Sequence, residues 1–203
     1  MEQRKWLYVA LFVLTIVALG FFIITWQSGM PAGGGIGVSQ SLPSLVQSPA
    51  EAATILGTWM RNNWAEDARL VGCTLTLSRR NPTEQNWNCQ AYSAQKNRLL
   101  VALVQGQDVK MLRDVTALYP PTVLAATAWN KDIQDILKVW WREGGATAWN
   151  ATSTATLTIH LGMREDGVPS WQFTVTRDKL NSLEYWEIHA NTGTLLEHST
   201  TGG

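Results

Sequence analysis

Reactive side chains are scarce in this 203-residue chain, which has two cysteines and three histidines. Lysine plus arginine and aspartate plus glutamate number 16 each, so neither a basic surface for nucleic acid nor an acidic tail is indicated. The sequence also lacks a Gly-x-Ser-x-Gly elbow, a phosphate-binding loop and an HExxH motif. We therefore expect a non-enzyme with no catalytic, cofactor-binding or metal-binding residues, and no nucleic-acid partner.

A zinc site is the one alternative interpretation of the three histidines. His160, His189 and His198 together with a carboxylate such as Glu187 form a set that zinc accepts in principle. No local ligand spacing connects them, and His160 and His189 fall on the polar faces of predicted strands. Solvent-facing histidines are therefore the favoured interpretation.

Charge is absent from residues 6–26, a run of 21 residues. A helix of this length reaches about 30 Å, which is the thickness of the hydrocarbon core of a bilayer. Trp6 and Trp26 stand at its ends, where aromatic rings favour the headgroup region. Arg4 and Lys5 precede it, so we expect a single-pass transmembrane helix with a cytoplasmic N-terminus and everything after Trp26 outside the cytoplasm.

A cleaved secretory signal is the main alternative for this stretch. The apolar region of a signal peptide usually runs about 7–15 residues, and this run continues beyond that length. No cysteine occurs before Cys73, which sets a lipid-anchor signal aside. An uncleaved anchor in the lipid bilayer is therefore favoured.

The two cysteines, Cys73 and Cys89, fall on two predicted strands, 69–78 and 87–94, joined by a hairpin loop. The alternation places both on the inward faces of neighbouring antiparallel strands, where a disulfide can form. An oxidising compartment across the membrane favours that pairing over a free nucleophilic thiol or a metal pair.

Two segments with the same order of elements follow a Gly/Ser/Pro-rich linker. Ser48 and Glu51 form a capping box at the start of a predicted helix, and four strands follow it. The pattern restarts with a helix capped by Asn130 and stopped at 144–145, again followed by strands. The predicted organisation is a cytoplasmic N-terminus (1–5), a transmembrane helix (6–26), a flexible linker (27–47), a first module (48–118) and a second module (128–198).

The two segments match each other in sequence. Trp59 aligns with Trp140 at an offset of 81, and Trp87 aligns with Trp171 at an offset of 84. Coincidence between two amphipathic patterns is the weaker explanation, because Ile-Leu-x-x-Trp-x-Arg is shared. We therefore expect an α+β fold in which a transmembrane helix precedes two tandem modules, each a helix packed on its own antiparallel sheet.

The second segment resembles a PepSY domain. The resemblance rests on residues 185–196, YWEIHANTGTLL, which are similar to the strand, Asp-Ala-x-Thr-Gly turn and strand of that family, with His189 in the aspartate position. Residues 171–175 are similar to the preceding tryptophan strand. An anchor followed by two cystatin-like modules is also the layout of TseB-type cell-wall elongation regulators. The resemblance implies a non-catalytic module outside the cytoplasm that binds or regulates a protein partner, and it transfers no site residue.

Two classes of function remain open. The first is an interaction module of the bacterial cell envelope that binds a protein partner through an exposed strand edge or an aromatic patch such as Trp141 or Trp149. The second is an accessory single-pass subunit of a larger integral membrane complex, held by its helix. The sequence does not name the partner in either case.

Overall fold

The computed structural model describes residues 42–125, 128–177 and 182–201 of the chain. They belong to one compact unit, Ser39–Gly203. The apolar run 6–26, with Trp6 and Trp26 at its ends, lies outside the described residues, as does most of the predicted linker. Within the part that is described, no helix is long and apolar enough to cross a membrane.

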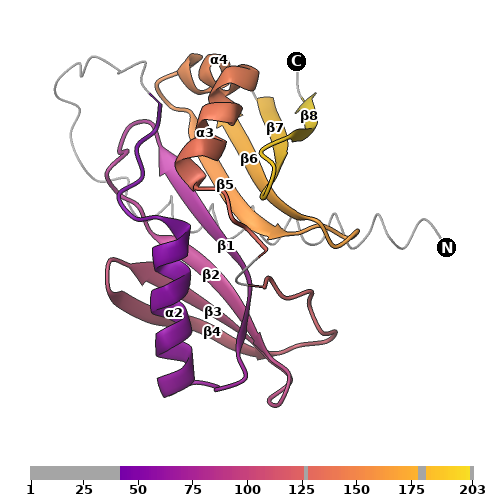
Figure 1. The fold of residues 1–203 in the computed structure, drawn as a ribbon. Coiled ribbons are helices and arrows are strands. Elements are labelled where there is room, and N and C mark those ends of the chain that lie inside the picture. Colours follow the sequence, from indigo (N-terminus) through magenta and orange to yellow (C-terminus); the bar gives the residue numbers. More distant parts are fainter. Residues whose placement is uncertain (1–41, 126–127, 178–181, 202–203) are drawn as a thin grey trace. The chain divides into compact units, whose positions relative to one another are not determined.

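The described residues form a single antiparallel sheet with short helices. Its eight strands run in the order β4-β3-β2-β1-β5-β6-β7-β8, as Figure 1 shows. The elements are α2 (Pro49–Asn63), β1 (Arg69–Ser78), β2 (Trp87–Ser93), β3 (Arg98–Gln105), β4 (Asp108–Thr116), α3 (Ile133–Trp140), a π-helical turn η1 (Trp141–Gly145), α4 (Ala146–Asn150), β5 (Thr156–Met163), β6 (Pro169–Arg177), β7 (Ser182–His189) and β8 (Leu195–Thr201).

The expected fold class is wrong in one central respect, because the two segments do not have separate sheets. Strand β1 pairs with β5 in antiparallel fashion, from Cys73 opposite Leu161 to Ser78 opposite Thr156. One hydrophobic cluster runs beneath both halves and includes buried side chains from α2, α3 and the central strands. Alternation in a sequence shows which face of a strand is buried, but it does not show which strand lies at its edge. Two independent modules therefore could not be distinguished from one continuous sheet.

We call the β1–β5 pairing the seam. The pairing register of the strands is the same on both sides of it. Trp87 lies opposite Val104 in the first half, and Trp171 lies opposite Ile188 in the second, at a common offset (171 − 87 = 84). Leu75 of β1 lies opposite Ile159 of β5 at the same offset. The seam therefore joins two halves of equal register around this central pair.

Helix α2 begins as predicted, whereas the second helix does not. The Ser48 hydroxyl accepts from the Glu51 backbone, and the Glu51 carboxylate accepts from the Ser48 backbone, which confirms the capping box. The second helix is capped by Asp132 instead of Asn130. Helical geometry breaks at Glu143 and at Gly144 (φ 106°), which confirms the predicted stop, and a separate helical turn, α4, follows from Ala146.

The alignment of Trp59 with Trp140 is not matched by the packing. The N-caps, Ser48 and Asp132, are 84 positions apart (132 − 48 = 84). At this offset Trp140 is the position equivalent to Leu56. Leu56 and Trp140 are both fully buried, while Trp59 only packs partly against the core. The shared Ile-Leu-x-x-Trp-x-Arg therefore does not mark equivalent helix positions.

The disulfide between Cys73 and Cys89 is confirmed. The two residues lie directly opposite each other on β1 and β2, with their Cα atoms 4.1 Å apart, and both are fully buried. Their position beneath α2 gives the bond no exposed surface. The bond therefore closes the β1–β2 hairpin from inside the core.

We predict that replacing both cysteines, Cys73→Ala with Cys89→Ala, lowers the free energy of unfolding by about 3 kcal/mol, because the unfolded chain regains the entropy of a short loop. Urea unfolding of the two proteins measures the difference. Wild type incubated with reductant under native conditions is the control and should stay oxidised, since both sulfurs are buried. An unchanged unfolding free energy in the double variant would contradict the prediction.

Candidate functional site

Edge strand β4 gathers exposed apolar side chains. Of the eight large hydrophobic residues that are exposed in the described part of the chain, five lie between 111 and 119: Met111 (49%), Leu112 (43%), Val115 (44%), Leu118 (89%) and Tyr119 (78%). Among the described residues β4 pairs with β3 alone, so its other side forms an open edge of the sheet (Figure 1). We call Asp108–Thr116 with residues 117–119 the β4 edge.

The opposite edge of the sheet is different in character. Strand β8 exposes one large hydrophobic side chain, Leu196 (40%), and is otherwise rich in Ser and Thr. Unpaired backbone is present at both ends of the sheet, but several exposed large hydrophobic side chains are present at only one of them. The β4 edge is therefore the better candidate for a binding surface.

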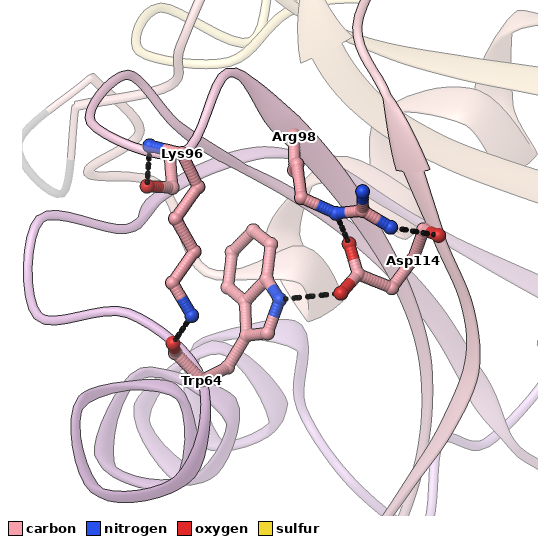
Figure 2. A network of polar contacts seen from close by, with 5 residues as sticks. Trp64, Lys96, Arg98 and Asp114 are labelled. Atoms are coloured by element: carbon pink, nitrogen blue, oxygen red, sulfur yellow. Dashed lines mark hydrogen bonds and ion pairs between the residues drawn. The ribbon is translucent and has the colours of Figure 1, made fainter.

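A polar network holds β4 against the end of α2, as Figure 2 shows. The Asp114 carboxylate accepts from Arg98 Nε at 2.6 Å and from the Trp64 indole at 3.2 Å. Arg98 also donates to the Asp114 carbonyl, and Lys96 donates to the Trp64 carbonyl. Burial alone raises the pKa of Asp114, but the bonds from Arg98 and Trp64 outweigh it and lower that pKa below its usual value. Asp114 is therefore a fixed anion that anchors the β4 edge.

The tryptophans of the second half mostly fill its core. Trp140 stacks on Phe173 at 5.4 Å between ring centroids and meets Trp186 edge-on at 6.0 Å. The close approach of Gly145 is required here, because a Cβ at that position would lie 2.3 Å from the Trp140 ring. Sequence patterning found the aromatic residues but not this arrangement, which depends on the π-helical turn.

The two predicted partner contacts lie in this aromatic region. Trp141 is half-buried and packs against Trp140, with ring centroids 5.9 Å apart. The Trp149 side chain is only 4% exposed, and its carbonyl accepts from Arg79 at 2.7 Å. Trp149 therefore offers a partner almost no surface, while a contact role for Trp141 stays a prediction.

A second polar cluster lies on the sheet face away from the helices. Glu187 is 4% exposed and accepts from Arg164 Nη1 at 2.8 Å, Ser170 Oγ at 2.6 Å and Gln172 Nε2 at 3.2 Å. Burial raises the pKa of the neighbouring Tyr185, and the charge of Glu187 adds to that effect. These donors satisfy the carboxylate, so the cluster is structural. No group of three or more His, Cys, Asp or Glu among the described residues is placed to hold a metal ion.

His160 is half-buried on that same face, whereas the expectation was a ring that faces solvent. Its Nδ1 lies 2.8 Å from the Thr74 hydroxyl. The ring rests over two glycines, since a Cβ at Gly72 would lie 3.1 Å from its Cε1 and a Cβ at Gly162 only 2.6 Å from its Nε2. Burial therefore lowers the pKa of His160 to about 4, and the folded protein holds the ring neutral.

We predict that this histidine makes stability rise with pH between about 4 and 6.5. In that window the unfolded chain binds a proton that the folded chain does not bind, so the free energy of unfolding increases with pH. Urea unfolding across the window measures the slope. His160→Gln should flatten it. Equal slopes in wild type and His160→Gln would contradict the prediction.

Comparison with known proteins yields a fold likeness only. No family model and no curated protein sequence matches this chain. The crystal structure of a "putative lipoprotein" from Clostridium difficile 630 is similar, with a TM-score of 0.51 at 13% identity over 76% of this chain and 99% of that one. At this identity the likeness extends to the fold alone.

Proposed function

We propose that this chain is a non-catalytic interaction module, associated with the membrane and exposed outside the cytoplasm, that binds an extended segment of a protein partner along the β4 edge. The observation that carries the proposal is the open backbone of β4 beside five exposed apolar side chains. A strand added to a sheet edge gains affinity from main-chain hydrogen bonds and specificity from the side chains that flank them.

The charges at this edge favour a particular kind of segment. The register places Lys110 opposite Leu103 and Arg113 opposite Val101, so both cations lie on the face away from α2. Neither takes part in an ion pair within the described part of the chain. The favoured occupant is therefore an extended segment with acidic side chains on one face and apolar side chains on the other.

The anchoring of β4 also suits such a role. Because Asp114 is bonded to Arg98 and Trp64, the strand is held in place before any partner arrives. A pre-ordered edge loses less conformational entropy on binding than a mobile loop does. Placement at the membrane is supported by the apolar run 6–26, and the PepSY and TseB resemblances favour a regulator of the cell envelope.

The alternative is an accessory subunit held in a larger membrane complex by its N-terminal segment. Capture experiments in mild detergent separate the two when the full chain is compared with a fragment beginning at Ser39. The fragment starts there because residues 42–47 pack on the fold, where Val46 N donates to Gln85 at 2.8 Å and the Gln47 side chain donates to Gly106 at 2.7 Å. A module that binds through β4 keeps its partner in the fragment, whereas a subunit held by its N-terminal segment loses it.

We predict that the double variant Met111→Glu with Leu112→Glu reduces capture of the partner at least about tenfold, since two negative charges replace apolar contact at the edge and repel an acidic segment. Both side chains are more than two-fifths exposed, so folding should persist. Leu196→Glu makes the same kind of change at β8 and is the matched control. Quantitative mass spectrometry of the captured proteins provides the measurement. Equal loss in both variants, or in neither, would contradict binding at the β4 edge.

A further inference from the structure

Two tryptophans at equivalent positions differ in their hydrogen bonds. Trp87 and Trp171 each occupy the same register position in its half, and each is 1% exposed. The Trp87 indole donates to the carbonyl of Gln47, the residue before the N-cap of α2, at 3.0 Å. The Trp171 indole nitrogen has no partner among residues 42–125, 128–177 and 182–201, although Lys131 occupies the corresponding position before the N-cap of α3. A buried indole N–H without an acceptor lowers the stability of the fold. We therefore looked for a group that could accept a hydrogen bond from Trp171.

Trp171 also lines a small pocket at the starts of the two helices. The pocket has a volume of about 80 Å³ and is lined by Ser48, Pro49, Ala50, Trp129, Lys131, Asp132, Ile133 and Trp171. Trp129 stacks nearly parallel on Trp171, with ring centroids 6.3 Å apart. The walls are therefore largely apolar and aromatic, and Trp171 is part of them.

The polar groups around this pocket are mainly donors. The positive ends of α2 and α3 both face it, and Lys131 adds a cation. The Ser48 hydroxyl caps Glu51 N and the Asp132 carboxylate caps Gln134 N, so neither cap binds the amides of Ala50 and Ile133. Asp132 is the one anion in the lining, and its Oδ1 is held in the cap at 2.7 Å from Gln134 N.

We propose that this pocket binds a carboxylate carried on a short apolar group, either a free short-chain acid or the C-terminal residue of a peptide. The carboxylate accepts from the Trp171 indole and from the first-turn amides of the two helices. Its apolar part packs on Pro49 and Trp129. The Trp171 nitrogen is covered in the structure, and Trp129 stacks on its ring, so the proposal requires Trp129 to shift when the ligand binds. This site is separate from the β4 edge and does not depend on the proposed function.

The test follows the Trp171 indole N–H resonance of the ¹⁵N-labelled full-length protein in detergent micelles. Three probes are titrated at millimolar concentrations: propionate, N-acetyl-Ala-Ala with a free carboxylate, and the same peptide as its C-terminal amide. We expect the resonance to shift with at least one carboxylate and not with the amide. A response to propionate alone identifies a free acid, and a response to the peptide identifies a chain terminus.

Variants provide the controls. Trp171→Phe keeps an aromatic ring but removes the donor, and should weaken carboxylate binding about tenfold or more, as followed by the Trp129 resonance. Trp87→Phe changes the equivalent, already paired indole and should leave binding unchanged. Ala50→Leu fills the pocket from an exposed helix position and should block binding. It therefore tests the site independently if Trp171→Phe does not fold. The proposal is overturned if neither carboxylate shifts the resonance, if the amide shifts it equally, or if Ala50→Leu binds like wild type.

Discussion

The antiparallel pairing of β1 with β5 is the constraint on which the rest of this structure depends. It places Leu75 opposite Ile159 at the centre of the sheet, with both side chains fully buried. Each half alone would leave this strand edge open, and an open central edge is a site of unwanted association. Pairing the two edges with each other covers both and merges the cores beneath them. The outermost strands, β4 and β8, then become the free edges of the sheet.

Both candidate binding sites lie on surfaces that the β1–β5 pairing leaves exposed. The helices bury one face, so apolar surface outside the core is confined to a few places, chiefly the β4 edge. The same seam brings the starts of α2 and α3 to one pocket beside Trp171. Both candidate sites thus depend on the joining of the halves, although they present different chemistry. One offers open backbone and apolar side chains, and the other offers donors and aromatic walls.

Sequence reasoning predicted local elements well and long-range arrangement poorly. Alternation gave the bounds of β1 and the inward faces of Cys73 and Cys89, and capping chemistry gave the start of α2, because these depend on neighbouring residues. The β1–β5 pairing has no local signal, which is why separate modules were expected. The β4 edge was foreseen only as some exposed strand edge, since the exposure of Met111 is set by its place in the strand order.

The second half shows the same limit in its details. The matching tryptophans suggested an offset of 81 in the helices, but burial of Leu56 and Trp140 follows the caps at 84. Trp149 is expected in an exposed aromatic patch, whereas the helical turn α4, which follows the kink at Gly144, buries it. The position of His160 over Gly72 and Gly162 likewise depends on the register of β1 against β5. Each of these features is set by contacts between distant residues.

Native-state hydrogen exchange of the full-length protein tests most directly whether the seam makes one cooperative unit. Amides of Thr74–Ser78 in β1 and of Thr156–His160 in β5 should exchange only through global opening, with the same free energy. Edge amides in β4 and β8 should exchange faster. If the amides of β5–β7 instead opened together at a clearly lower free energy than those of β1–β3, the halves would be independent modules and the single-sheet account would be contradicted.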